Sequence, residues 1–143
     1  MKNIFIATST FCEFSNRPIE LLRQSGFELT INNKKKKVSS EELLKQIHEF
    51  DGIIAGTEIY DDNILNRAKA LKVISRVGVG IDNIDLNFAK VNNIKVFISQ
   101  TNPAAAVAEL VICLIISLTR KVYLQSQELK KGVWEKQMGS LLS

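Results

Sequence analysis

The sequence predicts an α/β fold built around one five-stranded parallel sheet. Up to Thr101, five short apolar segments alternate with segments of helical pattern. Parallel strands need such crossover connections, whereas hairpins would join antiparallel strands. The apolar segments also lack strict polar alternation, which is typical of strands covered on both faces. We therefore expect a doubly wound, flavodoxin-like sheet with strands at residues 3–8, 27–31, 52–55, 71–77 and 94–99.

The helices of this domain are predicted from their ends and their apolar faces. Residues 17–26 carry Pro18 in the first turn and Gly26 at the end, the usual places for these residues. Residues 39–50 open with a capping pattern, in which Ser39 or Ser40 is followed by Glu42. Their apolar residues fall on one helical face: Leu43, Leu44, Ile47 and Phe50. Two further helices are expected at residues 61–70 and 84–93.

The rest of the chain does not fit this domain. Asn102 is a suitable N-cap and Pro103 a suitable first residue for a helix that runs to about Thr119. A second helical stretch, residues 121–136, is followed by no further strand pattern. We therefore predict a first domain at 1–101. Residues 102–143 are read as interdomain helices that begin a second, incomplete domain.

Composition and charge argue against a nucleic-acid partner. The 143 residues suffice for one ordinary domain, and contents of 45% hydrophobic and 24% charged residues are those of a globular protein. The net charge of +4 is modest, and much of it lies in the lysine run 34–37. A solvated lysine loop explains this run better than a basic binding face does.

The cysteines and the longest apolar segment indicate the cellular compartment and whether the chain crosses a membrane. Cys12 and Cys113 have no metal-ligand spacing, so we expect free thiols in a cytoplasmic protein and no metal site. Residues 104–118 are apolar but are interrupted by Glu109. They fall short of the roughly 18 uninterrupted apolar residues that a membrane span needs. We therefore predict a buried helix here and no membrane partner.

The most informative loop is the glycine turn Gly78–Val79–Gly80, which follows the fourth predicted strand. Glycines at the carboxyl end of a parallel strand can turn successive N–H groups toward one point and form a small anion site. A dinucleotide fingerprint would need a third glycine at position 83, where the chain has Asn83. It would also need a carboxylate about 20 residues on, and residues 97–102 contain none. The turn is therefore interpreted as a carboxylate-sized anion site, with a purely structural turn as the alternative.

The loops after the first and third strands face each other in this strand order. They contain small and hydroxyl residues that suit a polar ligand, although such residues are also ordinary in loops: Ser9, Thr10, Gly56, Thr57 and Glu58. Asp82 and Asp85 could form a carboxylate pair, but helix capping and turn hydrogen bonds are the simpler interpretation.

Three segments together carry a resemblance to a known family. The stretches "RVGVGIDNID", "TNPAAAVAELVICLIISLTR" and "KKGVWEKQMGSLLS" resemble the D-isomer-specific 2-hydroxyacid dehydrogenases, the phosphoglycerate dehydrogenase-like group, over essentially the whole chain. The resemblance implies a flavodoxin-like substrate domain joined by a long helix to a Rossmann domain that binds NAD. The family's nucleotide fingerprint would begin just after "QMGSLLS". The chain thus resembles the substrate-binding half and the linker helices of such an enzyme.

The resemblance also implies roles for single residues. Val79 and Gly80 correspond to backbone amides that hold the substrate carboxylate, and Val79 also to a position on the nicotinamide side of the cofactor. Ala55–Gly56 stands where relatives often have arginine and serine, which argues against a phosphorylated substrate. The predicted substrate-binding residues are Gly56, Thr57, Gly78, Val79 and Gly80, and the predicted cofactor-binding residues are Val79 and Asn102.

The same resemblance places the catalytic arginine, glutamate and histidine in the missing half, so no catalytic residue is expected here. His48, the only histidine, matches no catalytic motif, and Arg76 is expected to have a structural or capping role. Val107, Ala108 and Glu109 match the linker helix. Because this helix is apolar nearly all round, we expect a homodimer through residues 103–119, with contacts at Leu110 and Leu114.

Two functions remain open. One is the first part of an NAD-dependent enzyme that transfers hydride between NAD and a 2-hydroxy or 2-keto acid. The other is a truncated, non-catalytic fragment or a small-acid-binding module. In both cases the chain alone is expected to hold no NAD and to be inactive.

Overall fold

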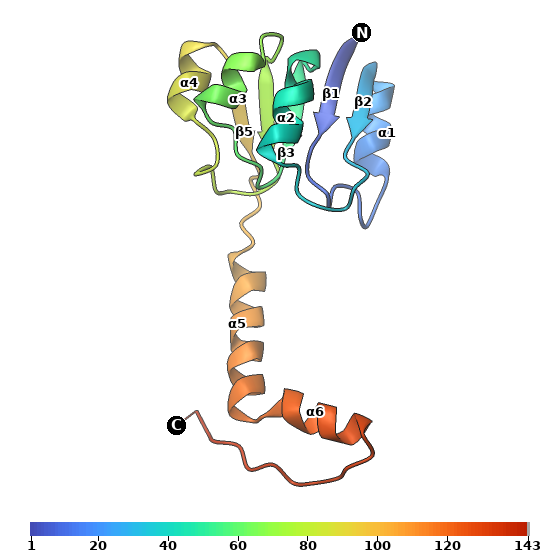
Figure 1. The fold of residues 1–143 in the computed structure, drawn as a ribbon, viewed down its shortest axis with the longest axis vertical. Helices are drawn as coiled ribbons and strands as arrows, with labels where there is room; N and C mark the ends of the chain where they lie inside the picture. The colour runs from blue at the N-terminus through green and yellow to red at the C-terminus, as the bar shows by residue number, and fades with distance from the viewer. Residues whose placement is uncertain (143) are drawn as a thin grey trace. The chain divides into compact units, whose positions relative to one another are not determined.

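The computed structural model describes residues 1–142 and contains two compact units (Figure 1). The first unit, Met1–Thr101, contains every strand of the described chain. The second unit, Asn102–Ser143, contains the two helices α5 and α6. Since the glycine turn lies in the first unit, that unit carries the candidate site.

The sheet of the first unit has five parallel strands in the order β2-β1-β3-β4-β5, which confirms the predicted fold class. Its strands are β1 (Lys2–Ile6), β2 (Phe27–Ile31), β3 (Gly52–Ala55), β4 (Val73–Arg76) and β5 (Lys95–Ile98). The order changes direction between β1 and β3. The loops that follow these two strands therefore leave the sheet side by side.

Three helices of the first unit begin with a capping side chain. The helices of this unit are α1 (Arg17–Gln24), α2 (Ser40–Gln46), the short 3₁₀ turn η1 (Ile47–Glu49), α3 (Asp62–Arg67) and α4 (Leu86–Val91). Ser39 and Glu42 form the predicted capping box at α2. Asp85 caps α4 by accepting the N–H of Phe88 at 2.9 Å, in agreement with the capping interpretation. The helix predicted to continue to Phe50 is wrong in its last part, because the chain tightens into η1 after Gln46.

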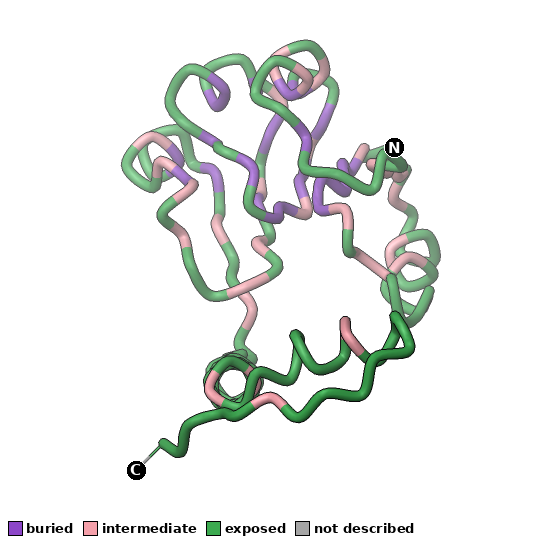
Figure 2. Tube along the Cα trace, turned by 60° about the horizontal axis from the view of Figure 1, so that its bottom comes forward, coloured by how far each residue is buried: buried purple, intermediate pink, exposed green. Residues whose placement is uncertain are grey.

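The hydrophobic core lies on one face of the sheet, where α2, α3 and α4 contact one another in turn. Figure 2 shows that the buried residues gather in the first unit. Phe5, Ile53 and Ile74 are paired side by side in the register of β1, β3 and β4, and all three are buried. Phe5 also stacks on Phe50, with ring centroids 4.8 Å apart. The helices close this core with buried apolar residues that include Leu43, Ile47, Ile64, Leu65 and Ala89.

The other face of the sheet is covered only in part, which corrects the expectation that both faces are buried. Successive side chains of a strand point to opposite faces. Ile54, Ser75 and Phe97 are register partners on the face opposite the core, and Phe97 is 56% exposed. Helix α1 packs beside β2, at the other edge of the sheet (Figure 1). Within the first unit, the residues of β4 and β5 on this face therefore lack helix cover.

In the second unit, α5 (Ala104–Thr119) ends at the predicted residue and begins one residue later than predicted, whereas α6 (Val122–Lys130) is shorter than predicted. Asn102 is not the N-cap, because Pro103 takes that position, and the Asn102 side chain accepts the N–H of Ala104 at 2.9 Å. The helix expected over 121–136 ends at Lys130, because Gly132 turns the chain with a φ of +77°. No strand follows within the described residues, up to position 142.

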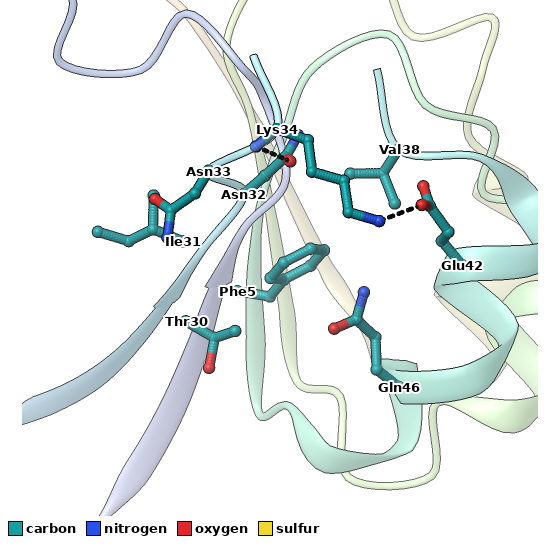
Figure 3. Close-up of a pocket in the computed structure, with 9 residues that line it drawn as sticks. All are labelled: Phe5, Thr30, Ile31, Asn32, Asn33, Lys34, Val38, Glu42 and Gln46. Atoms are coloured by element: carbon teal, nitrogen blue, oxygen red, sulfur yellow. Dashed lines mark hydrogen bonds and ion pairs between the residues drawn. The ribbon is translucent and has the colours of Figure 1, made fainter. Parts of the chain in front are cut away.

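The ion pair at the start of α2 couples this helix to the lysine loop (Figure 3). The Glu42 carboxylate accepts from the Lys34 ammonium group and from the backbone N–H of Ser39. These two hydrogen bonds, that of Lys34 first, lower the pKa of Glu42 to about 2. The ionised carboxylate therefore stabilises the folded chain above its ordinary pKa of 4.5, and this contribution is lost as the pH falls toward 2.

We predict that Glu42→Gln flattens the dependence of thermal stability on pH between 4.5 and 2. The melting temperature of the native chain should fall across this interval more steeply than that of the variant, as measured by circular dichroism. Glu41→Gln is the control, since Glu41 is exposed in the same first turn and forms no capping box. Equal pH profiles for the native chain and Glu42→Gln would contradict the assignment.

Candidate functional site

The glycine turn follows β4 and is anchored to the strands on both sides. The N–H of Val77 donates to the carbonyl of Ala55 at 2.8 Å, and the N–H of Ser99 donates to the carbonyl of Gly78 at 3.0 Å. Gly78 has a φ of +137°, a conformation that a residue with a side chain rarely adopts. The turn is thus a defined backbone structure at the carboxyl edge of the sheet.

The amides of this turn are not used by the protein. Within residues 1–142, the N–H groups of Gly78, Val79 and Gly80 meet no protein acceptor; Gly78 is half-buried, and Val79 and Gly80 are exposed. A backbone N–H group needs a hydrogen-bond partner in water or in a ligand. Adjacent free amides at the end of a parallel strand can bind a small anion such as a carboxylate.

The loop after β3 contains a buried carboxylate. Glu58 is only 2% exposed, and its Oε2 accepts the N–H of Gly56 at 2.7 Å. Gly56 is itself buried, whereas Thr57 between them is exposed. A Cβ on Gly56 would lie 2.9 Å from Cβ and Oγ1 of Thr8, so only glycine lets the loops after β1 and β3 approach this closely. Of the predicted residues, Gly56 therefore shapes the wall of the crevice, and Thr57 faces solvent.

Asn83 joins this loop to the loop that carries the glycine turn. Its side-chain amide donates to the carbonyl of Glu58 at 2.6 Å and to that of Gly56 at 3.3 Å. In the backbone, Tyr60 N–H donates to the carbonyl of Asn83 at 2.8 Å, and Asp85 N–H donates to that of Tyr60 at 2.9 Å. In the sequence, Asn83 is notable only because it stands where a dinucleotide fingerprint would have its third glycine. The structure shows that it clamps two loops together.

Tyr60 lies beneath this clamp and stays protonated. Its side chain is fully buried, and its hydroxyl lies 3.5 Å from Oε2 of Glu58. Burial, and secondarily the negative charge of Glu58, raises the pKa of Tyr60 well above its ordinary value of 10.0. Tyr60 therefore cannot act as a base at neutral pH, and it has a structural role.

The remaining candidates make no hydrogen bond to residues 78–80 in the described chain. His48 lies on η1, is exposed, and has its Nε2 3.9 Å from Oε1 of Glu49. Ser9 is half-buried and Thr10 exposed on the loop after β1, where the Thr10 hydroxyl lies 3.4 Å from that of Thr8. Asp82 is exposed, while Asp85 is used as a helix cap.

The described residues do not fit a dinucleotide or a metal ion. Asn83 occupies the position of the third glycine with a side chain that is already hydrogen-bonded, and residues 99–102 supply no carboxylate for a ribose. Among residues 1–142, no group of three or more His, Cys, Asp or Glu side chains could hold a metal ion. No helix in this part of the chain has the length and apolar character needed to span a bilayer.

A separate cavity of about 290 Å³ lies between the end of β2 and α2, lined by the residues labelled in Figure 3. It includes the Lys34–Glu42 ion pair and has Phe5 among its apolar residues. No residue of the glycine turn lines it. This cavity is therefore distinct from the candidate acid site.

Comparison with known proteins gives a family match over most of the chain. Residues 6–136 match a family described as "D-isomer specific 2-hydroxyacid dehydrogenase, catalytic domain". The chain is 32% identical over 123 residues to the D-3-phosphoglycerate dehydrogenase of Archaeoglobus fulgidus, covering 85% of this chain and 23% of the relative. It is 36% identical over 122 residues to the hydroxypyruvate reductase of Thermotoga maritima, covering 80% of this chain and 40% of the relative.

Solved structures agree with these matches. The TT0316 protein of Thermus thermophilus superposes with a TM-score of 0.80 at 26% identity, covering 99% of this chain and 44% of that protein. The NAD⁺-bound 3-phosphoglycerate dehydrogenase of Entamoeba histolytica has a TM-score of 0.72 at 26% identity, covering 99% of this chain and 43% of that protein. The chain thus spans less than half the length of each of these proteins.

We predict that Gly78→Ala destabilises the chain and that Gly80→Ala does not. At Gly78 the positive φ disfavours a side chain, and a Cβ would overlap the guanidinium of Arg76, so we expect a loss of about 1–3 kcal/mol. At Gly80 a Cβ meets open space, and the change should stay within about 0.5 kcal/mol. Urea unfolding followed by circular dichroism measures both. Equal losses for the two variants would show that the turn does not have the described geometry.

Proposed function

Since the chain belongs to the family of D-isomer specific 2-hydroxyacid dehydrogenases, we propose that residues 1–101 bind the carboxylate of a small 2-hydroxy or 2-keto acid at the glycine turn. The observation that supports this proposal best is the pair of free, exposed amides at Val79 and Gly80. These amides lie on a turn whose backbone is fixed by hydrogen bonds to β3 and to the end of β5. A preformed pair of donors binds a carboxylate without the cost of ordering a loop.

In this proposal each residue near the turn has a distinct task. Val79 and Gly80 donate to the carboxylate, and Gly78 provides the positive φ that the turn before them requires. Gly56 cannot donate, because its N–H is already bonded to Glu58, so it contributes space and not a hydrogen bond. Thr57 is exposed and offers a hydroxyl to the rest of the acid. The absence of arginine and serine at Ala55–Gly56 favours an acid without a phosphate group.

The hydride chemistry belongs, in this proposal, to an NAD site outside residues 1–142, because these residues do not fit the dinucleotide. In the complete enzyme, Val79 and Asn102 would be the residues of this chain that contact the NAD bound at that site. The catalytic arginine, glutamate and histidine would likewise lie outside, so we expect no dehydrogenase activity from the 143 residues alone. The second candidate function is an acid-binding module without catalysis. It rests on the same observation, that residues 1–142 do not fit a dinucleotide.

We propose a cytoplasmic location. Cys12 and Cys113 are free thiols, which supports a reducing compartment, the cytoplasm.

The first test of this proposal is titration of the ¹⁵N-labelled chain with oxalate, a small dicarboxylate. We expect the amide resonances of Val79 and Gly80 to shift most, because their N–H groups would receive the new hydrogen bonds. Acetamide, which has similar size but no charge, is the matched control. NAD should cause no comparable shifts. Unmoved Val79 and Gly80 resonances at saturating oxalate would rule the site out.

The two candidate functions are separated by complementation. The 143 residues are mixed or co-expressed with the nucleotide-binding half of a relative, and NADH oxidation is followed with 2-keto acids. Activity that depends on both parts supports the enzymatic function. Oxalate binding without activity in any such combination supports the acid-binding module.

We also propose that the chain forms a homodimer through residues 103–119. Helix α5 consists of apolar residues almost throughout, and Leu110 and Leu114 are 58% and 52% exposed. Apolar side chains gathered on one exposed helix mark an association surface.

Light scattering should therefore give a dimer for the native chain and a monomer for Leu110→Glu with Leu114→Glu, because buried charges oppose the contact. The control is Ser126→Glu, which adds charge at an exposed position of α6. A native monomer at high concentration would refute the dimer.

A further inference from the structure

The part of the carboxyl edge around the glycine turn is acidic, whereas the lysine run 34–37 follows β2, the far edge strand of the sheet. The charged residues of the loops that follow β1, β3 and β4 are all acids: Glu13, Glu58, Asp61, Asp82 and Asp85. Arg76, the last residue of β4, is the base that stands next to these loops. An anion that approaches such an edge is repelled by the carboxylates, and two amide dipoles offset this repulsion only in part. An acid site at the turn therefore needs a positive charge nearby.

Arg76 has a charge that no carboxylate neutralises. Within residues 1–142, no Asp or Glu oxygen lies within 4 Å of its guanidinium. Its Nη1 donates to the carbonyl of Val77, and its buried Nε has no hydrogen-bond partner in the described chain. Partly buried arginines are normally paired, and a buried donor without an acceptor calls for an explanation. Most donors of this guanidinium are thus not used by the protein itself.

The guanidinium lies against the glycine turn. The space that a Cβ on Gly78 would occupy is filled by Nη1 and the central carbon of Arg76. Gly78 directly precedes Val79 and Gly80, whose amides are free. The side chain of Arg76 is half-buried, so part of it reaches solvent. A single turn therefore brings together two free amides and one unpaired cation.

We infer that Arg76 is a substrate-binding residue that supplies the positive charge for the acid group held by Val79 and Gly80. This inference rests on the proposed function and adds the charge that the proposed amide pair lacks. Arginine suits this task because its planar fork of N–H donors matches a carboxylate and keeps its charge at every physiological pH. The ligand class is a small acid with one or two carboxylates.

The competing role for Arg76 is purely structural, as a cap on the Val77 carbonyl. The two roles predict different effects of replacing Arg76. If Arg76 is only a cap, any side chain with one donor of suitable length replaces it, and removing the donor disturbs the ligand-free turn. If Arg76 is the binding cation, removing its charge weakens binding in proportion to the charge of the ligand, and less strongly at high salt.

The test uses the 143-residue chain and two probes, the dianion oxalate and the monoanion oxamate, titrated by calorimetry and by ¹⁵N NMR at low salt. We expect Arg76→Gln to weaken oxalate binding about tenfold or more, the usual effect of losing a charged hydrogen bond. Oxamate binding should weaken less. Arg76→Lys should recover part of the loss, and Arg67→Gln, which removes an exposed charge from the last turn of α3, should match the native chain.

Each outcome decides between the roles. Native affinity in Arg76→Gln overturns the inference while the proposed acid site stands, whereas absence of oxalate binding in the native chain overturns both. Equal losses for the two probes, with shifted Val79 and Gly80 resonances in the ligand-free variant, assign Arg76 the cap role. If Arg67→Gln loses as much oxalate affinity as Arg76→Gln, the effect comes from the overall charge of the chain, and this result overturns the inference. If Arg76→Gln fails to fold, Arg76→Lys and the salt dependence of native oxalate binding decide, and salt-independent binding overturns the inference.

Discussion

The parallel register of β1, β3 and β4 makes the candidate site possible. Parallel pairing brings the carboxyl ends of these strands to one edge, and the reversal of order between β1 and β3 sets their following loops against each other. The contact is close enough that Gly56 has no room for a Cβ beside Thr8. The buried row Phe5, Ile53 and Ile74 fixes this register, since a shift by one residue would turn these side chains away from the core.

On this framework, buried polar groups determine the shape of the edge. A carboxylate as buried as that of Glu58 is costly unless it is hydrogen-bonded, and the N–H of Gly56 meets this need within the same loop. The side chain of Asn83 then ties that loop to the one that carries the glycine turn. The donors at Gly56 and Asn83 are thus used within the protein, whereas the N–H groups of Val79 and Gly80 meet no protein acceptor in residues 1–142. The unpaired cation Arg76 lies at the same turn.

Each unit has an apolar surface that its own described residues leave uncovered. One is the face of β4 and β5 opposite the core, where Phe97 is exposed, and the other is α5. The chain spans 23% of the phosphoglycerate dehydrogenase and 40% of the hydroxypyruvate reductase with which it was compared. The first unit nevertheless has a closed core on the α2–α4 face, so the geometry of the glycine turn does not rest on either exposed surface.

Features that depend on neighbours along the chain could be predicted from the amino-acid sequence. Strand and helix positions, the capping box at Ser39, the cap at Asp85 and the location of the glycine turn all follow from local patterns of apolar, capping and turn residues. Local patterns misjudged the ends of α2 and α6, where the last turns depend on how the chain leaves the helix. They also led to the wrong expectation that both faces of the sheet are covered.

The way in which distant residues complete the site is visible only in the folded chain. Asn83 bonds to carbonyls 25 and 27 residues away, and no pattern along the chain marks such a pair. The same holds for the Thr8 contact that requires glycine at position 56. The folded chain also shows that the guanidinium of Arg76 lies against Gly78 and has no carboxylate partner in residues 1–142. The physical reason is that hydrogen bonding and electrostatics act across space, whereas sequence periodicity reports only on the local backbone.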